Sequence, residues 1–291
     1  MNGIFAASIT PFDSLNRVNQ KAIASLIQWN LKQGADGFFL GGSSAECFLL
    51  TEQERIEVFE AASEFKNQTT LVAHVGAVST DEAIRYAREA KRLGFQHIAA
   101  TPPFYYGFSA KQVAQYYYDL SDSVDMPVLI YNFPGNTNRP FDLSDPDTQA
   151  LFCSRAVLGV KHTNLNLFQM ERIRHLNPSL TVMNGFDETM VAGLALGADG
   201  SIGSTFNFML PHYKKIYNSY RSGDREGALA LQVKANNIME ALCSVGLIPA
   251  IKYVLTTMGI DAGLPRRPFL ALDSSQKTFL NQILKENLEN N

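Results

Sequence analysis

Short apolar segments recur along the chain at intervals of roughly 20 to 35 residues, and polar segments separate them. These segments are rich in Ile, Val, Leu and Phe, and most are apolar at every position rather than at alternate ones. That pattern is typical of strands buried on both faces of a parallel sheet. The eight predicted strands are residues 4–9, 37–40, 71–75, 97–100, 127–131, 157–161, 180–183 and 200–202.

Helical patterns fill the intervals between the predicted strands. Thr51 and Glu54 have the spacing of a capping box, which predicts a helix that begins after Thr51. Ser79 and Glu82 predict a second capping box, and Asn19 is a candidate cap for the first helix. The predicted helices are residues 21–32, 51–65, 79–93, 109–122, 166–176, 186–196 and 211–220. This regular alternation favours a (β/α)8 TIM barrel over a doubly wound sheet.

The chain length is compatible with two domains or with one barrel. A typical domain has about 150 residues, so 291 residues would allow roughly two, whereas a TIM barrel uses about 250 residues as one domain. We predict a barrel over residues 1–222 and a C-terminal helical extension over residues 223–291, packed on the barrel, because no linker rich in Gly, Ser or Pro separates them. The predicted helices of the extension are residues 224–243, 249–258 and 275–288.

The composition excludes several classes of protein. Charged residues make up 18% of the chain, the net charge is −3 and there is no long basic run, so we expect neither nucleic acid nor a membrane surface as partner. No apolar run is long enough to span a bilayer. The first residues lack the basic region of a signal peptide, and the 3 cysteines are odd in number and widely spaced. We therefore expect reduced thiols and a cytoplasmic location.

Lys161 ends the sixth predicted strand, in the sequence Val-Leu-Gly-Val-Lys. In TIM barrels the reacting groups lie at the carboxyl ends of the strands. A lysine at the inner end of a buried strand is poorly solvated, which favours a neutral amine, and a neutral amine can form a Schiff base with a carbonyl. The alternative is a lysine that reaches solvent or pairs with a carboxylate.

Tyr131 ends the fifth predicted strand, so we expect it beside Lys161 inside the barrel. A phenol in that place can relay a proton to and from a substrate oxygen. The alternative is a core tyrosine whose hydroxyl is already hydrogen-bonded.

Candidate binding loops follow three of the strands. Gly41 and Gly42 permit close backbone approach, and Ser43 and Ser44 add hydroxyl groups, so this loop could seat a carboxylate. Ala45 breaks the GxSxG pattern of a nucleophile elbow, which disfavours a serine hydrolase. Two acidic residues follow the seventh strand. They either recognise substrate hydroxyls or interact favourably with the positive N-terminal end of their own helix. A loop rich in Gly and Ser follows the eighth strand, where many barrels bind phosphate. These last two segments are Asp187–Glu188 and residues 200–205.

The sequence contains no motif typical of a metal site or a nucleotide-binding site. The 5 histidines show no HxH or HExxH spacing, and His162 should point away from the barrel interior because it follows Lys161 in the strand. The chain contains neither a GxGxxG fingerprint nor a Walker loop. We predict that the protein needs no metal and no cofactor.

In combination, these segments resemble the N-acetylneuraminate lyase and dihydrodipicolinate synthase family of class I, pyruvate-dependent aldolases. The similarity runs from Ile4 to about Phe269, nearly the whole chain, and no single motif in it is specific. The motifs are Gly41-Gly42-Ser43-Ser44-x-Glu46, Tyr131-Asn132-x-Pro134, Val160-Lys161-x-Thr163, Gly185-x-Asp187-Glu188 and residues 197–204.

The resemblance implies roles for these residues. Lys161 would form the Schiff base, Tyr131 would relay protons with Ser43, and Ser43 and Ser44 would bind the pyruvate carboxylate. Tyr106 matches a tyrosine lent to the site of a neighbouring subunit, and the family is commonly tetrameric. The remaining residues would hold the hydroxylated tail of a sugar acid or line the cleft; they are Thr163, Gly185, Asp187, Glu188 and Ser204.

The lyase branch of the family is the closer match, because the Asp187–Glu188 pair, Thr163 and Ser204 are features of the lyases. Four positions depart from the family pattern. Ser44 and Ala45 replace the commoner Thr and Gly, and Asn138 stands where Gly is usual. Asn136 stands where the synthases have a carboxylate-binding Arg and most lyases have an apolar residue, so the identity of the sugar is left undecided.

The resulting hypothesis is reversible cleavage of a 2-keto sugar acid, with N-acetylneuraminate giving pyruvate and N-acetylmannosamine as the leading case. The nearest alternatives are another pyruvate-dependent aldolase or a dehydratase acting on 2-keto-3-deoxy sugar acids, or dihydrodipicolinate synthase itself. A non-catalytic protein that binds sugar acids and a metal-dependent aldolase are alternatives of other classes.

Overall fold

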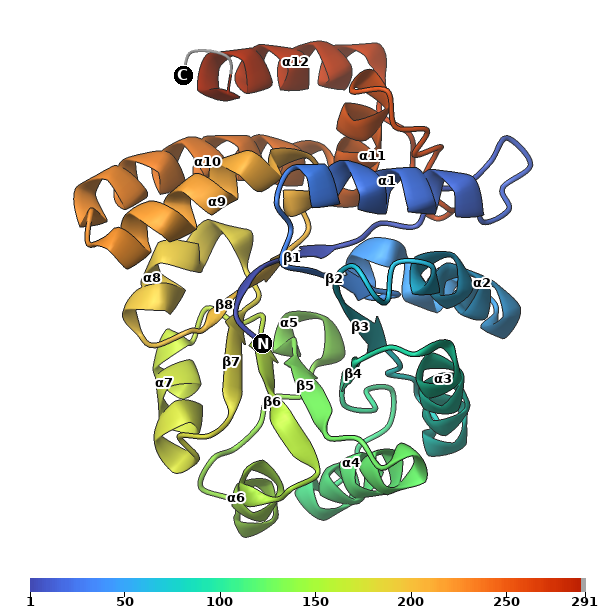
Figure 1. The fold of residues 1–291 in the computed structure, drawn as a ribbon, viewed down its shortest axis with the longest axis vertical. Helices are drawn as coiled ribbons and strands as arrows, with labels where there is room; N and C mark the ends of the chain where they lie inside the picture. The colour runs from blue at the N-terminus through green and yellow to red at the C-terminus, as the bar shows by residue number, and fades with distance from the viewer. Residues whose placement is uncertain (289–291) are drawn as a thin grey trace.

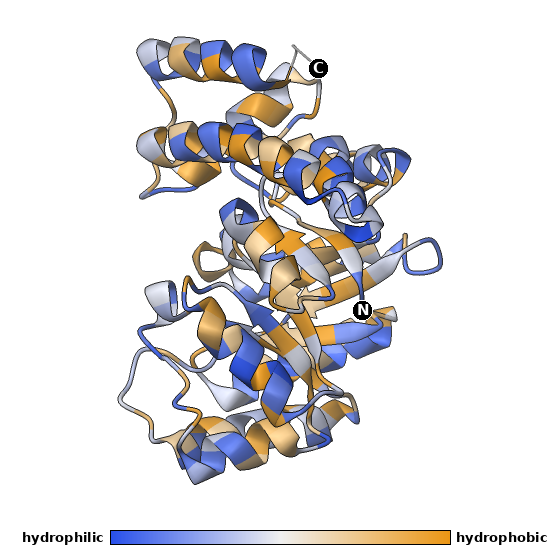
Figure 2. Cartoon of the chain, turned by 90° about the vertical axis from the view of Figure 1, so that its left-hand side faces the viewer, coloured by the Kyte–Doolittle hydropathy of each residue, from blue (hydrophilic) through white to orange (hydrophobic). Residues whose placement is uncertain are grey.

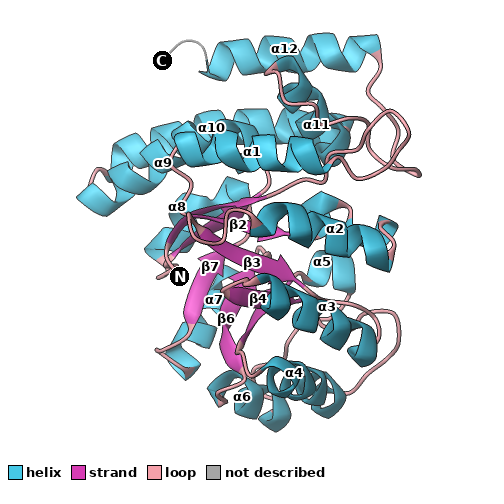
Figure 3. Ribbon diagram, turned by 45° about the vertical axis from the view of Figure 1, so that its right-hand side comes forward, coloured by secondary structure: helices cyan, strands magenta, loops and turns pink. Residues whose placement is uncertain are grey.

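The computed structural model describes residues 1–288, so residues 289–291 of the predicted extension lie outside the described residues. Eight parallel strands form a closed barrel in chain order, and β8 pairs back with β1. Helices surround the strands, which are magenta at the centre of Figure 3. The predicted (β/α)8 barrel is confirmed. The strands are β1 (Gly3–Ala7), β2 (Gly37–Leu40), β3 (Thr70–His74), β4 (His97–Ala100), β5 (Val128–Asn132), β6 (Val157–His162), β7 (Thr181–Asn184) and β8 (Gly200–Gly203).

Side chains alternate between the barrel interior and the layer between the strands and helices. On β1, Ile4 and Ala6 pack in the large core cluster under the helices, whereas Phe5 and Ala7 belong to a smaller cluster inside the barrel. Both faces are therefore apolar, which explains the continuous apolar runs and the largely orange strands of Figure 2.

Helices follow the strands and continue into a C-terminal layer. The helices of the barrel are α1 (Gln20–Lys32), α2 (Glu52–Ser63), α3 (Thr80–Leu93), α4 (Ala110–Val124), α5 (Pro134–Thr137), α6 (Pro146–Cys153), α7 (Leu167–Leu176), α8 (Met190–Ala195) and α9 (Phe206–Ser222). The helices of the C-terminal extension are α10 (Arg225–Val245), α11 (Leu247–Thr257) and α12 (Ser274–Leu288). In Figure 1 these last three helices, in orange and red, stack on one side of the barrel, with α10 beside α9 and α12 outermost.

Two of the three predicted caps form. Thr51 and Glu54 make the complete capping box of α2, and the Asn19 side chain accepts a hydrogen bond from the Ala22 N–H at the start of α1. Ser79 is the N-cap residue of α3, but its predicted capping box does not form, because the Ser79 side chain makes no capping hydrogen bond. The Glu82 carboxylate instead accepts a hydrogen bond from the Tyr86 hydroxyl at 2.9 Å.

Three helical segments differ from the sequence-based prediction. No helix was predicted between β5 and β6, where α5 and α6 lie; both are too short for a clear 3.6-residue period. The predicted helix at residues 186–196 is a 3-10 turn, Asp187–Thr189, followed by the short α8. Helix α9 begins at Phe206 rather than at Pro211. Its backbone is non-helical at Met209, because Pro211 inside the helix clashes with the preceding turn.

No single helix within residues 1–288 is long and apolar enough to cross a membrane, although α10 and α11 pass such a test if they are joined across their 114° bend.

Candidate active site

The ends of β5 and β6 bring Tyr131 and Lys161 together. The two strands are paired so that Tyr131 is opposite Lys161 and Asn132 is opposite His162. Because side chains alternate along a strand, Tyr131 and Lys161 face the barrel interior and their neighbours face the helices. His162 accordingly points away from the interior, as predicted, and its ring contacts the Asn132 amide and the Asn166 carbonyl.

Lys161 is 3% exposed and does not reach solvent. Its Nζ donates a hydrogen bond to the Thr163 hydroxyl at 3.3 Å and lies 3.7 Å from the centre of the Tyr131 ring. The amine therefore sits against an aromatic face and a hydroxyl rather than in an ion pair. Such a group is available to attack a carbonyl carbon.

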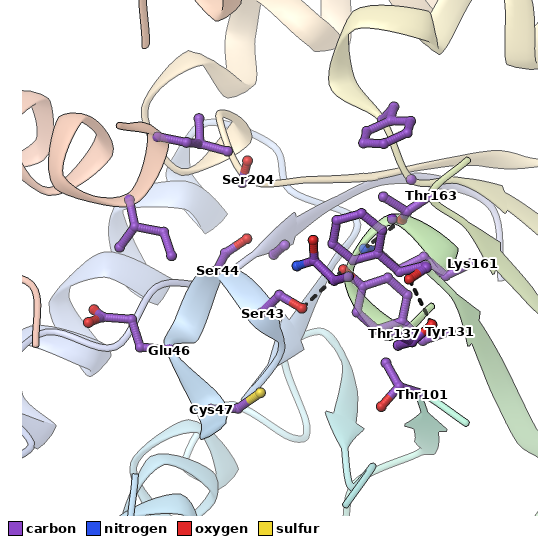
Figure 4. Close-up of a pocket in the computed structure, with 18 of the residues that line it drawn as sticks. Ser43, Ser44, Glu46, Cys47, Thr101, Tyr131, Thr137, Lys161, Thr163 and Ser204 are labelled. Atoms are coloured by element: carbon purple, nitrogen blue, oxygen red, sulfur yellow. Dashed lines mark hydrogen bonds between the residues drawn. The ribbon is translucent and has the colours of Figure 1, made fainter. Parts of the chain in front are cut away.

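Tyr131 is held by aromatic contacts around its ring. Phe39 and His74 meet it edge to face, and Phe133 stacks on it with ring centroids 5.7 Å apart. Its hydroxyl points to Ser43 Oγ at 3.5 Å, the long limit of a hydrogen bond. Figure 4 shows Ser43, Tyr131, Lys161 and Thr163 grouped around one space.

The loop after β2 presents Ser43 and Ser44 from a 3-10 turn, Ser43–Ala45. The His74 ring contacts the Gly41 carbonyl at 2.9 Å, and the Thr101 N–H donates to its other nitrogen at 3.3 Å. Burial lowers the pKa of His74 to about 3, so the ring is neutral: Nδ1 donates to Gly41 and Nε2 accepts from Thr101. This neutral histidine links the start of the serine loop to the end of β4.

Glu46 closes the serine loop with left-handed backbone angles, φ 57° and ψ 34°. Its carboxylate lies 2.6 Å from Nζ of Lys252 on α11, and both side chains are nearly inaccessible to solvent. The Arg266 N–H donates to the second carboxylate oxygen, also at 2.6 Å. Glu46 therefore has a structural role: it holds the loop that carries Ser43 and Ser44. The sequence alone did not distinguish this role from that of the binding residues beside it.

The loop after β7 carries Gly185, Asp187 and Glu188. One Asp187 oxygen accepts hydrogen bonds from the Thr205 N–H at 2.8 Å and from the Thr205 hydroxyl at 2.6 Å. Thr205 precedes α9, so Asp187 supports the start of a different helix from the one that the sequence suggested. Burial raises the pKa of Asp187, and burial together with the Asp187 charge raises the pKa of Glu188.

A cavity of about 770 Å³ opens where these loops meet. All predicted site residues except Tyr106 line it: Ser43, Ser44, Tyr131, Lys161, Thr163, Gly185, Asp187, Glu188 and Ser204. Tyr106 is 60% exposed in the loop after β4, outside this cavity, and its role stays a prediction.

Other lining residues were missed by sequence reasoning. Thr101, Phe48 and Phe104 come from barrel loops, and their types carried no signal of function. The extension contributes Met239, Cys243, Leu247, Ile248, Pro268 and Phe269. Apolar residues on these helices are indistinguishable in sequence from ordinary core residues.

Two departures from the family pattern have a visible place. Asn138 follows α5 with φ 50°, in the left-handed region that glycine and then asparagine tolerate best, so Asn can replace the usual Gly. Asn136 lines the cavity, where it offers an amide and no positive charge. Among residues 1–288, no three His, Cys, Asp or Glu side chains are grouped so that they could hold a metal ion.

Comparisons with known proteins agree with this geometry. The model of the dihydrodipicolinate synthetase family matches residues 1–287. The chain is 38% identical to the N-acetylneuraminate lyase of Rhizobium meliloti over 285 residues, which cover 98% of this chain and 94% of the relative.

Two solved structures share the whole architecture. The Clostridium difficile protein CdNal, in complex with mannosamine, is 32% identical with a TM-score of 0.95, and the match covers 99% of both chains. The N-acetylneuraminate lyase of Fusobacterium nucleatum, complexed with pyruvate, is 31% identical with a TM-score of 0.92, over 99% of this chain and 97% of that chain.

Proposed function

Because the chain belongs to the dihydrodipicolinate synthetase family, we propose that it is a Schiff-base lyase that reversibly cleaves a 2-keto sugar acid, N-acetylneuraminate in the first instance, to pyruvate and N-acetylmannosamine. The observation that carries the proposal is the buried Lys161 amine, set against the Tyr131 ring in a cavity lined by both candidate binding loops. The chain is also similar over almost its full length to proteins named N-acetylneuraminate lyase.

The reaction starts with attack of the Lys161 amine on the C2 ketone of the open-chain substrate. Loss of water gives a protonated imine, which acts as an electron sink. Tyr131 takes the C4 hydroxyl proton while its own proton passes to the substrate carboxylate, either directly or through the Ser43 hydroxyl, which gives up one proton as it accepts another. The C3–C4 bond then breaks, its electron pair forms the enamine, and the sugar aldehyde leaves. Protonation at C3 and addition of water release pyruvate and restore the amine.

The two ends of the substrate would bind to different loops. Ser43 and Ser44, which line the cavity beside Tyr131, hold the carboxylate next to the imine. Gly185, Asp187, Glu188 and Ser204 hold the hydroxyl groups of the sugar tail, and Thr163 orients the Lys161 amine through its hydrogen bond.

The synthase alternative is disfavoured by Asn136. The residue lines the cavity, but its amide cannot form the bidentate ion pair that a guanidinium makes with a carboxylate. Cleavage or dehydration of a shorter 2-keto-3-deoxy acid would use the same chemistry at Lys161 and Tyr131. An aldolase or dehydratase for such acids is therefore the second candidate.

Borohydride reduction in the presence of pyruvate tests the mechanism, and a substrate panel tests the specificity. We expect reduction to attach the pyruvate carbon skeleton to Lys161, located by peptide mass, with full activity in the presence of a chelator. Among sialic acids and shorter 2-keto-3-deoxy acids, N-acetylneuraminate should release pyruvate fastest. An enzyme that forms no adduct is not a Schiff-base lyase, and one that prefers the shorter acids belongs to the second candidate class.

Gly185 offers a test of the support around Lys161. An added Cβ would lie 2.0 Å from the Thr163 hydroxyl oxygen and 2.9 Å from the Thr163 backbone nitrogen, so Gly185→Ala must displace Thr163. Because Thr163 hydrogen-bonds the Lys161 amine, we expect kcat to fall by about 10-fold or more, as misplaced catalytic groups can cost about 100-fold. Steady-state kinetics measure this effect. The control is Gly107→Ala, whose added Cβ meets nothing within 4 Å, and equal kinetics for the two variants would contradict the role of Thr163.

The assembly and the location are also proposals. We infer a cytoplasmic homotetramer in which Tyr106 completes the site of a neighbouring subunit. Supporting features are the exposed side chains of Tyr105 and Tyr106, which contact each other edge to face, and the three unpaired thiols, Cys47, Cys153 and Cys243.

A further inference from the structure

The two candidate binding loops are both held by the C-terminal extension. Each loop contains a short 3-10 turn, Ser43–Ala45 or Asp187–Thr189, and few hydrogen bonds of its own fix such a turn. Their substrate-facing side chains therefore depend on neighbouring elements for position. Besides the barrel contacts of His74 and Thr205, the neighbours that hold them include α11 in the first case and α10 in the second.

On the carboxylate side, Lys252 of α11 forms the ion pair with Glu46 at 2.6 Å, with 1% and 0% of the two side chains exposed. The Lys252 ammonium also lies 4.0 Å from the centre of the Phe12 ring and donates to the Leu264 carbonyl. Glu46 follows the serine turn directly, so the ion pair fixes the end of the turn that carries Ser43 and Ser44.

Such a buried pair adds little to stability, because desolvation of two charges offsets their attraction. Buried ion pairs can instead select one arrangement of the chain. The Glu46–Lys252 pair joins the loop after β2 to a helix that lies outside the barrel, which is the arrangement expected of a positioning contact.

On the sugar side, Gln232 of α10 is 4% exposed and lies against the backbone of the acidic turn. Its amide nitrogen donates to the Asp187 carbonyl at 3.0 Å, and its oxygen accepts from the Val191 N–H at 3.1 Å. The neighbouring Asn236 donates to the Glu188 carbonyl at 3.1 Å. Both acids of the turn thus have their backbones held by side chains of one helix.

We propose that the extension positions the two halves of the substrate separately: Lys252 sets the serine turn that binds the carboxylate, and Gln232 sets the acidic turn that selects the sugar tail. Both are positioning residues, since they act through Glu46 and through the backbone of Asp187. The inference rests on the proposed function, because it assigns the two ends of a 2-keto sugar acid to the two turns.

The experiment compares a carboxylate-side variant with a sugar-side variant. The carboxylate-side variant is Glu46→Gln combined with Lys252→Met, which removes both buried charges together. The sugar-side variant is Gln232→Met, which removes the three hydrogen bonds of the amide, to Asp187, Val191 and Asn236, at similar side-chain length. The controls are Thr257→Val on α11 and Glu240→Gln on α10, exposed positions outside the cavity. Circular dichroism and thermal unfolding establish that each variant is folded.

Two readouts separate the ends of the substrate. The pyruvate concentration that gives half-maximal borohydride trapping reports on the carboxylate side. The ratio of kcat/KM for N-acetylneuraminate to kcat/KM for a shorter 2-keto-3-deoxy acid reports on the sugar side. For the carboxylate-side variant, we expect the half-trapping concentration to rise about 10-fold and the ratio of the two kcat/KM values to stay unchanged. A 10-fold change corresponds to a small displacement, since a misplaced group can cost about 100-fold. For Gln232→Met, we expect the ratio to fall about 10-fold with unchanged trapping.

The outcomes distinguish the proposals. If the wild-type enzyme gives no pyruvate adduct, the proposed function fails regardless of the variants. If the wild-type adduct forms and the folded variants change neither readout, or change both equally, the positioning roles are wrong. Should the double variant fail to fold, Glu46→Gln alone is the second test. Lys252 and the Arg266 N–H contact different oxygens of Glu46, and glutamine places a donor NH2 group opposite one of these two donors. A several-fold rise in half-trapping concentration is therefore still expected, and no rise would refute the role of Lys252.

Discussion

Replacement of Lys161 with alanine is expected to abolish cleavage of N-acetylneuraminate while the barrel stays folded. The amine is the only group in the proposed mechanism that bonds covalently to the substrate, so no other side chain can form the imine. Loss of kcat should be at least about 10⁴-fold, as for other catalytic nucleophiles. Pyruvate release, coupled to NADH oxidation by a lactate dehydrogenase, measures the loss.

The fold should tolerate this change because Lys161 contributes little to it. Within residues 1–288 its amine makes one hydrogen bond, a 3.3 Å contact with Thr163, and no ion pair. Lys161→Met fills more of the vacated space than alanine does, so it should be inactive and at least as stable as the alanine variant.

The matched control is Lys215→Met, at an exposed position on α9. It should retain both activity and borohydride trapping. Residual trapping in Lys161→Met, at another lysine, would show that the Schiff base is not formed by Lys161 alone.

Much of the fold follows from local sequence because the strands are apolar on both faces and most of them are followed by a recognisable helix. The neighbourhood of Tyr131 and Lys161 was predictable for the same reason. Both residues end consecutive strands, and consecutive strands of a barrel pair with each other, as the register of β5 and β6 confirms.

The contribution of the extension was not predictable from the same reasoning. Glu46 and Arg266 are 220 residues apart, and Gln232 meets Asp187 across 45 residues, so no local pattern links them. The cavity walls from α10 and α11 consist of apolar residues such as Met239 and Ile248, whose types are those of any packed helix. Short elements such as α5 were missed because four residues span only about one helical turn, so the apolar pattern cannot repeat within them.

Replacement of Tyr131 with phenylalanine is expected to lower kcat by about 10² to 10⁴-fold, the usual contribution of a positioned acid or base. Phenylalanine keeps the ring, so the contacts with Phe39, His74 and Phe133 and the aromatic face beside Lys161 remain. What is lost is the hydroxyl that points to Ser43. Pyruvate should still be trapped on Lys161 by borohydride, with a half-trapping concentration within a few-fold of the wild-type value.

A second buried tyrosine provides the comparison that isolates this hydroxyl. Tyr117 is fully buried on α4, and its hydroxyl donates to the Ala100 carbonyl at 3.1 Å, so Tyr117→Phe also removes one buried hydrogen bond. That variant should lose about 1 kcal/mol of unfolding free energy, with kcat unchanged. If Tyr131→Phe resembles it, with wild-type turnover, Tyr131 does not relay the proton. A loss of turnover confined to Tyr131→Phe, with intact imine formation, places the phenol at the C–C bond-breaking step, because imine formation and bond cleavage are then separated in one variant.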